Sequence, residues 1–284
     1  MSKQQTIKRT AYQNFIEPLQ TEATKRAYST GLEAFKTYMK AGNYEKLLEQ
    51  GTNDNITNFI QYLKKEEKAH KTIRIYLTAI KHFYVMNDVV TINWDKVRKF
   101  VGKATTKTHD EIYTRPQIAT ILEKSRERER ISFLLMTSAG LRIGAIPSLK
   151  VGDLTKVNSL YRIKVYAGTT SEYQTFCSPE CADAIDAYLK MRRERGEEIT
   201  AESPLLIQLG KKIEQVNLTG LISILNRALL DSGVRIEGDN KYNRQRIPRF
   251  HAFRKYFNTA LAKAGVKPAL KEVLMGHYIG LESS

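Results

Sequence analysis

The segment His251-Ala252-Phe253-Arg254-Lys255-Tyr256 opens a stretch with helical periodicity over residues 249–263. In a helix, His251 and Arg254 lie three positions apart on one face, so an imidazole and a guanidinium converge on one point. The arginine fork binds two phosphate oxygens at once, and histidine donates a hydrogen bond or moves a proton near neutral pH. The pair predicts a phosphate site, although a surface pair or a capped core histidine is a commoner reason for this spacing.

A second histidine follows this segment. The pair Ala264-Gly265 predicts a helix end, and Lys267-Pro268 predicts the start of the next helix. That helix leads into the turn Met275-Gly276-His277. We therefore expect the histidine of this turn to meet the first histidine and its arginine in space.

A third motif lies upstream, in Gly140-Leu141-Arg142-Ile143. An apolar helix over residues 131–136 is predicted to end near Gly140, so that Arg142 lies at a junction between two helical segments. An arginine between two apolar neighbours costs desolvation free energy unless an anion pairs with it. This motif also indicates a phosphate ligand.

These three motifs, in this order, resemble the catalytic domain of tyrosine recombinases and phage-type integrases, with an archaeal-like character. That family carries a Gly-Leu-Arg box, a His-x-x-Arg box and a Gly-His turn, which correspond here to Gly140-Leu141-Arg142, His251 to Arg254 and Gly276-His277. The resemblance covers most of the chain. It implies a site-specific DNA recombinase that acts by metal-free phosphoryl transfer through a 3′-phosphotyrosyl intermediate, with double-stranded DNA as partner and no cofactor.

The resemblance also implies roles for individual residues. Arg142 and Arg254 would neutralise the charge that develops on the phosphate, while His251 and His277 would donate hydrogen bonds or shuttle the proton. No Asp or Glu cluster suited to two metal ions stands out in the sequence, which argues against a metal nuclease.

The catalytic lysine of the family has no clear counterpart here. Residues 160–166 and 173–176 alternate in the manner of strands and predict a β-hairpin, on which integrases carry a lysine that reaches toward the leaving oxygen. The turn at residues 167–170 holds no lysine, so we assign the role to Lys164 on the first strand. The alternative is that Lys164 is an ordinary lysine of the strand without a catalytic role. Ala145 is a second departure, because the family more often has an acidic residue there.

The family's nucleophilic tyrosine normally follows the Gly-His turn by a short distance, but the sequence reaches Ser284 first, and Tyr278 is too close to the turn to match. We therefore expect the tyrosine to be missing from this chain, which would bind DNA without cleaving it. The alternative function is a non-catalytic DNA-binding remnant or regulator derived from an integrase. A type IB topoisomerase, which shares the catalytic constellation, is a third option.

Recombinases of this kind usually assemble as tetramers through exchange of a C-terminal segment. The resemblance therefore implies a homotetramer on DNA. Because that segment is not expected in this chain, we expect a monomer in free solution.

The composition favours a polyanionic partner. The 284 residues carry a formal net charge of +16, for which DNA or RNA is a better ligand than a membrane surface. No apolar run could span a bilayer and the N-terminus lacks a signal-peptide core, so we expect a cytoplasmic, nucleoid-associated protein. Cys177 and Cys181 lack the further ligands of a zinc site, and we expect them to be reduced.

The length allows two domains. We assign residues 1–20 to a polar arm, 21–101 to a helical core-binding (SAM-like) DNA-binding domain, 102–111 to a linker, and 112–284 to a catalytic domain that is incomplete at its C-terminus. The predicted fold class is mainly α, α+β, in which an N-terminal helical bundle precedes a mixed domain with a small antiparallel sheet.

Within the second domain, Thr114 and Pro116 predict the start of a helix. The alternating charges of residues 126–130 predict a solvated turn, and residues 204–207 predict a third short strand.

Two basic segments are candidates for phosphate contacts. Residues 71–84 predict a helix whose apolar stripe leaves a basic second face, and residues 239–249 form a basic loop before the catalytic helix. For the helix, a merely solvated basic face is an equally good interpretation. The candidate DNA-contacting residues of the two segments are Lys71, Arg74, Lys81, Lys241, Arg244 and Arg246.

Overall fold

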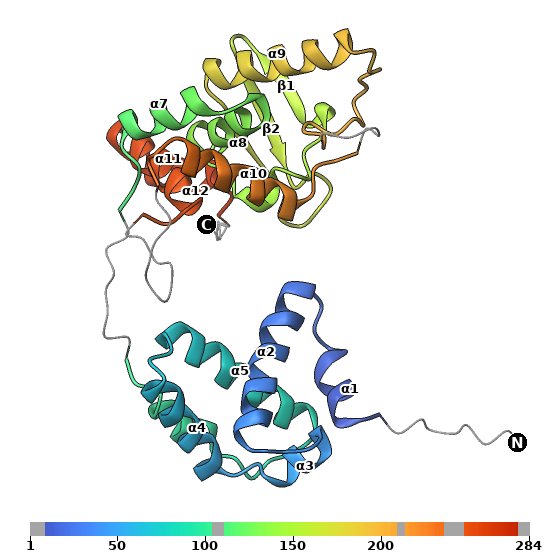
Figure 1. Cartoon of the computed structure of the whole chain (residues 1–284), viewed down its shortest axis with the longest axis vertical. Helices are drawn as coiled ribbons and strands as arrows, with labels where there is room; N and C mark the ends of the chain where they lie inside the picture. The colour runs from blue at the N-terminus through green and yellow to red at the C-terminus, as the bar shows by residue number, and fades with distance from the viewer. Residues whose placement is uncertain (1–8, 104–110, 209–213, 236–246, 278–284) are drawn as a thin grey trace, which may run out of the picture. The chain divides into compact units, whose positions relative to one another are not determined.

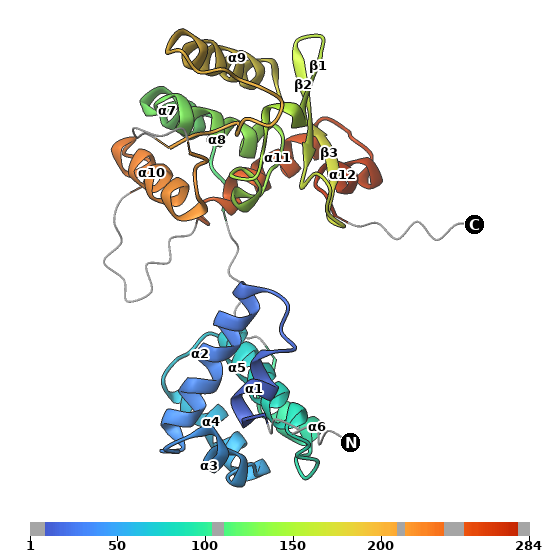
Figure 2. The ribbon, with the colours of Figure 1, turned by 90° about the vertical axis from the view of Figure 1, so that its right-hand side faces the viewer.

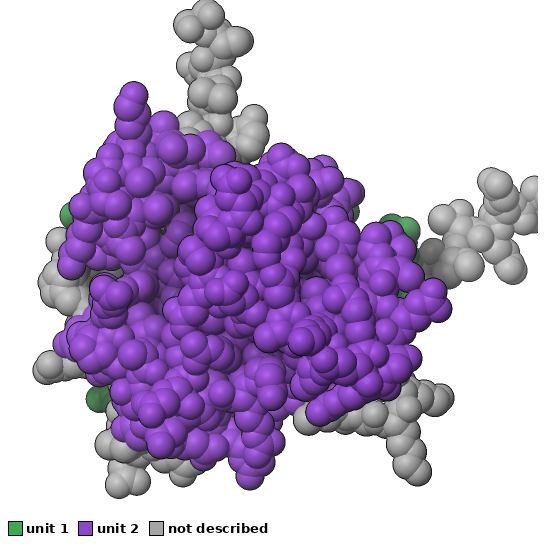
Figure 3. Space-filling model, turned by 90° about the horizontal axis from the view of Figure 1, so that it is seen from above, with its two compact units in different colours: residues 1–107 green, residues 108–284 purple. Residues whose placement is uncertain are grey.

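The computed structural model describes residues 9–103, 111–208, 214–235 and 247–277. The chain divides into two compact units, unit 1 (residues 1–107) and unit 2 (residues 108–284), shown in green and purple in Figure 3. The boundary falls within the segment predicted as a linker, most of which lies outside the described residues. Each unit has its own apolar core.

The described part of unit 1 is built from helices joined by turns (Figure 1). The apolar stripe predicted over residues 71–84 is buried, as a helix of that periodicity requires. Aromatic rings fill much of this core, with the ring centroids of Phe35 and Phe59 5.1 Å apart. The helices are α1 (Ala11–Ile16), α2 (Glu22–Tyr38), α3 (Tyr44–Glu49), α4 (Asn53–Lys65), α5 (His70–Met86) and α6 (Trp94–Lys99).

The predicted polar arm over residues 1–20 is wrong in its second half, where α1 lies. The Thr10 hydroxyl accepts a hydrogen bond from the backbone N–H of Gln13, whose side chain accepts one from the backbone N–H of Thr10. Phe15 is fully buried in the core of unit 1. A helix of six residues contains too few apolar positions to show a periodicity in the sequence.

Unit 2 places one apolar helix at the centre of a mixed α and β arrangement (Figures 1 and 2). Residues 131–137 of α8 are all buried, and α8 packs against α7, α9, α10 and α11. A helix that is apolar on every side requires such enclosure. The helices are α7 (Arg115–Lys124), α8 (Glu127–Ser138), α9 (Pro179–Glu194), α10 (Leu218–Asp231), α11 (His251–Lys263) and α12 (Pro268–Leu274), with short 3₁₀ segments η1 (Ile143–Ala145) and η2 (Val151–Asp153).

The sheet of unit 2 has three antiparallel strands in the order β1 (Leu154–Val157), β2 (Leu160–Val165) and β3 (Tyr173–Phe176). The β2–β3 hairpin was predicted from alternation, and α12 lies beside β3 (Figure 2). The predicted fold class, mainly α and α+β with a small antiparallel sheet, is confirmed.

Two local predictions in unit 2 are wrong. Residues 126–130 do not form a turn, because the carboxylate of Glu129 accepts a hydrogen bond of 2.7 Å from the backbone N–H of Arg126 and thereby caps the start of α8. Residues 204–207 form only isolated bridges, and the third strand is β1. Pro204 lacks the N–H donor that a strand ladder needs.

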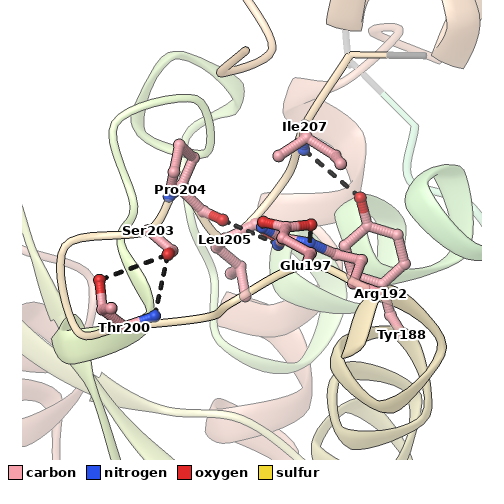
Figure 4. A network of polar contacts seen from close by, with 8 residues as sticks. All are labelled: Tyr188, Arg192, Glu197, Thr200, Ser203, Pro204, Leu205 and Ile207. Atoms are coloured by element: carbon pink, nitrogen blue, oxygen red, sulfur yellow. Dashed lines mark hydrogen bonds and ion pairs between the residues drawn. The ribbon is translucent and has the colours of Figure 1, made fainter. Parts of the chain in front are cut away.

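A buried ion pair holds the connection after α9 (Figure 4). The side chains of Arg192 and Glu197 are 2% and 8% exposed, and the Nε of Arg192 donates to Glu197 at 2.7 Å. Nη1 of Arg192 donates to the carbonyl oxygens of Pro204 at 2.8 Å and Leu205 at 2.9 Å. These bonds satisfy the buried cation, which keeps the chain beside the end of α9.

We expect Arg192→Ala to destabilise unit 2 by about 3–5 kcal/mol, because the carboxylate of Glu197 would remain buried without its partner. The matched control Arg193→Ala removes an exposed arginine of the same helix and should cost about 0.5 kcal/mol or less. Urea denaturation followed by circular dichroism measures both. The single tryptophan, Trp94, lies in unit 1, so its fluorescence transition should stay unchanged. A dichroism midpoint that is equal in the two variants would contradict this account.

Candidate active site

Helix α11 carries Arg254 into the interior of unit 2, where this residue is 3% exposed. Nη1 donates a hydrogen bond to the carbonyl oxygen of Gly140, and Nη2 donates to the carbonyl oxygen of Met275. One side chain therefore joins α11 to the end of α8 and to the turn after α12. The close approach needs a glycine at position 140, because a Cβ there would lie 2.3 Å from the Phe257 ring.

His277 completes this cluster. Its Nε2 lies 3.2 Å from Nη2 of Arg254, and its Nδ1 contacts the carboxylate of Glu272. Because a carboxylate accepts and a guanidinium donates, this geometry fits the tautomer with the proton on Nδ1 and a lone pair on Nε2. Glu272 was not identified from the sequence. Its position on the predicted helix, five residues before His277, was the available signal.

Arg142 lies at the helix junction that the sequence predicts, as the residue before η1. It is exposed, so the expectation that it is desolvated between its apolar neighbours is wrong. The desolvated arginine is Arg254: burial first, and then the charge of Arg142, lower the pKa of Arg254 below the usual value for arginine. The geometry agrees, because Arg254 donates to the carbonyl oxygen of Gly140, two residues before Arg142.

His251 is the first residue of α11 and is exposed. It lies one helical turn before Arg254, so both residues occupy the same face of the helix. The structure thus places Arg254 in contact with His277 and close to the segment that carries Arg142, with His251 at the start of the same helix.

Lys164 lies apart from this cluster in the sheet. It pairs in register with Gln174, and both residues are exposed. The neighbouring pair, Val165 and Tyr173, lies on the opposite face of the sheet, because successive side chains of a strand alternate between faces. The face that carries Tyr173 is the one that meets the arginines.

Tyr173 is a residue of this site that we did not identify from the sequence. A Cβ on Gly276 would lie 2.4 Å from Cδ1 and from Cε1 of the Tyr173 ring, so the ring packs directly on the glycine before His277. Burial raises the pKa of Tyr173, while the charges of Arg254 and Arg142 act in the opposite direction. Its position beside the hairpin turn, on the inward face of the alternation, was the available signal.

The candidate DNA-contacting residues divide into two groups. Lys71, Arg74 and Lys81 are exposed on one helix, α5. Lys241, Arg244 and Arg246 lie outside the described residues. Within the described ranges, no group of three or more His, Cys, Asp or Glu residues could hold a metal ion, and Cys177 and Cys181 are free and buried. Among the described helices, none is both long and apolar enough to cross a membrane.

We expect Gly276→Ala to destabilise unit 2 by about 1–3 kcal/mol more than the control Gly168→Ala. Both glycines have positive φ, +60° and +75°, so both variants introduce similar backbone strain. Only the Cβ at position 276 would meet the Tyr173 ring, whereas nothing lies within 4 Å of a Cβ at position 168. Thermal unfolding measures the difference, and equal melting temperatures would show that the ring is not packed on the glycine.

Comparisons with known proteins agree with this arrangement. The sequence profile described as "Phage integrase family" matches residues 105–279, and that described as "Phage integrase, N-terminal SAM-like domain" matches residues 12–87. Tyrosine recombinase XerC of Leptospira interrogans is 25% identical over 272 residues, which cover 92% of this chain and 81% of that protein. Tyrosine recombinase XerA of Thermococcus kodakarensis is 22% identical over 77% of this chain and 71% of its own length.

Solved structures share the fold at low identity. The XerH site-specific recombinase bound to a palindromic difH substrate has a TM-score of 0.69 at 16% identity, covering 90% of this chain and 74% of that chain. A lambda integrase dimer bound to a COC′ core site has a TM-score of 0.65 at 17% identity, covering 95% and 73%. Since the integrase profile spans more than half of the sequence, this chain belongs to the phage integrase family of tyrosine recombinases.

Proposed function

We propose that this chain is a site-specific recombinase of double-stranded DNA that activates a phosphodiester with Arg142 and Arg254. The observation that carries the proposal is the placement of these two cations near one another, where, among the described residues, no carboxylate pairs with either. Like charges in proximity are unfavourable until an anion binds between them. A phosphate with two free oxygens is the anion that fits two guanidinium forks.

Arg254 can still bind a ligand while it holds its place in the fold. Of its five N–H donors, three are used within the described residues: toward Gly140, Met275 and His277. A further donor faces the hydroxyl of Tyr173, which leaves one donor for a phosphate oxygen. Because burial fixes this guanidinium in place, it offers preorganised stabilisation to the charge that develops in an in-line displacement.

The proposed covalent step is the attack of a tyrosine hydroxyl on phosphorus. The bond from phosphorus to the 5′-oxygen breaks, a 3′-phosphotyrosyl bond forms, and the leaving oxygen takes up a proton. His251 and His277 are our candidates for hydrogen bonding or proton movement, and Lys164 is our candidate acid, although it lies on the far face of the sheet. The position expected for the nucleophile, shortly after Gly276-His277, lies outside the described residues, and its absence from this chain stays a prediction.

We assign DNA contacts in unit 1 to the basic face of α5. Lys71, Arg74 and Lys81 are exposed at spacings that place them along one side of the helix. Such a row can neutralise successive phosphates without reading sequence. A homotetramer on DNA, with a monomer in free solution, completes the proposal.

If α5 contacts phosphates, the triple substitution Lys71→Ala, Arg74→Ala and Lys81→Ala should weaken binding to all duplexes alike. The slope of log affinity against log salt should fall by about 3, since each phosphate contact contributes about 0.9. Fluorescence anisotropy with two unrelated 30-base-pair duplexes, titrated at several NaCl concentrations, gives the slope. As a control of equal charge, the triple Lys46→Ala, Lys64→Ala and Lys65→Ala removes exposed lysines of α3 and α4. Equal slopes in the two triple variants would show that α5 does not contact the DNA phosphates.

The catalytic proposal predicts a protein–DNA adduct on nicked duplexes, which trap a phosphotyrosyl bond, when the chain is extended by the residues encoded after Ser284. With a pool of nicked duplexes of random sequence, Arg142→Ala should slow adduct formation by about 100- to 1000-fold while DNA binding persists. Arg195→Ala, a second exposed arginine at the end of α9, serves as the control. DNA binding by the extended chain without any adduct would instead support the alternative, a non-catalytic DNA-binding remnant or regulator derived from an integrase.

A further inference from the structure

The hydroxyl of Tyr173 is buried beside Arg254, which can donate to it, but no acceptor among the residues that the structure describes takes the proton of the hydroxyl. Burial of an unpaired hydroxyl costs free energy, and most buried hydroxyl groups in proteins are paired. A buried hydroxyl whose proton has no acceptor among the described residues is therefore explained best by a ligand that supplies one.

The packing around the ring fixes where this hydroxyl lies. Tyr173 stands on β3 opposite Val165, on the inward face of the sheet. The face of the ring covers Gly276, which leaves no room for a side chain there. The tyrosine is thus held between the sheet and the turn that carries His277, and it cannot swing away without opening that contact.

The neighbours of the hydroxyl determine which ligand it can take. It lies near Arg254 and Arg142, whose charges both act on its titration. A guanidinium group has donors only, so neither arginine can accept the proton of the hydroxyl. An oxyanion bound between the two arginines would provide the missing acceptor.

We propose that Tyr173 is a phosphate-binding residue of the active site, whose hydroxyl donates a hydrogen bond to a non-bridging oxygen of the scissile phosphate. The inference rests on the proposed function, because it takes the phosphate to lie between Arg142 and Arg254. Tyr173 is then a contribution of the β2–β3 hairpin to the site from the sheet face opposite to that of Lys164, the candidate acid.

Orthovanadate, a tetrahedral oxyanion of the same shape as phosphate, is a suitable probe for the whole chain. Broadening of the monovanadate resonance in ⁵¹V NMR, titrated with protein, gives a dissociation constant. We expect Tyr173→Phe to weaken vanadate binding by about tenfold, as the loss of a hydrogen bond to a charged group does. We also expect its melting temperature to be equal to or higher than that of the unchanged protein, because an unpaired buried hydroxyl is removed.

Tyr161→Phe is the matched control. Tyr161 lies in the same sheet, on β2, and its hydroxyl already donates to the carboxylate of Asp186 on α9. That variant should lose thermal stability and bind vanadate normally, which is the reverse of the behaviour expected for Tyr173→Phe. A Tyr173→Phe variant that is less stable and binds vanadate as tightly as the unchanged protein would overturn the proposal.

The Arg142→Ala variant shows whether a negative result concerns only the role of Tyr173 or the proposed phosphate site as a whole. If the unchanged protein binds vanadate more tightly than Arg142→Ala and Tyr173→Phe binds like the unchanged protein, the phosphate site stands and the role of Tyr173 is wrong. If the unchanged protein binds no better than Arg142→Ala, the phosphate site itself is wrong, and the role of Tyr173 fails with it.

Discussion

The buried guanidinium of Arg254 is the group on which the candidate active site of unit 2 depends. It donates to the carbonyl oxygens of Gly140 and Met275 and approaches the ring of His277, so that one side chain ties together three segments. A buried cation is tolerated only where hydrogen bonds replace its water. The bonds that stabilise the fold therefore also hold the fork rigid, as a preorganised anion site requires.

The two arginines differ in burial: the buried one stabilises the fold, and the exposed one is open to a ligand from solvent. Arg254 is enclosed by α11 and α8, whereas Arg142 is exposed at the junction before η1. Burial, and after it the charge of Arg142, lower the pKa of Arg254, and a bound anion would offset both. The sheet closes the site from another side, because the Tyr173 ring lies on Gly276. The site is thus assembled by α8, η1, α11, β3 and the turn after α12, and each element supplies one part.

The sequence predicts long amphipathic elements well. The stripe of α5, the start of α7 at Thr114 and the β2–β3 hairpin all appear where periodicity and capping residues indicate them. Its errors lie where a short element depends on partners far away. Helix α1 is six residues long and depends on the core of unit 1, and the charged residues before Ile131 start a helix because the following residues are enclosed.

The sequence by itself determined the family, the basic charge and the order of the three motifs that carry Arg142, Arg254 and His277, because each motif is a local pattern. Only the tertiary structure decided which residues join them. Strand register places Tyr173 inward and Lys164 outward. The sequence predicts desolvation of Arg142, but the buried arginine is Arg254. Arg254 donates to the carbonyl oxygen of Gly140, which lies 114 positions earlier in the chain. Such choices depend on pairing and burial between distant segments, which no local periodicity encodes.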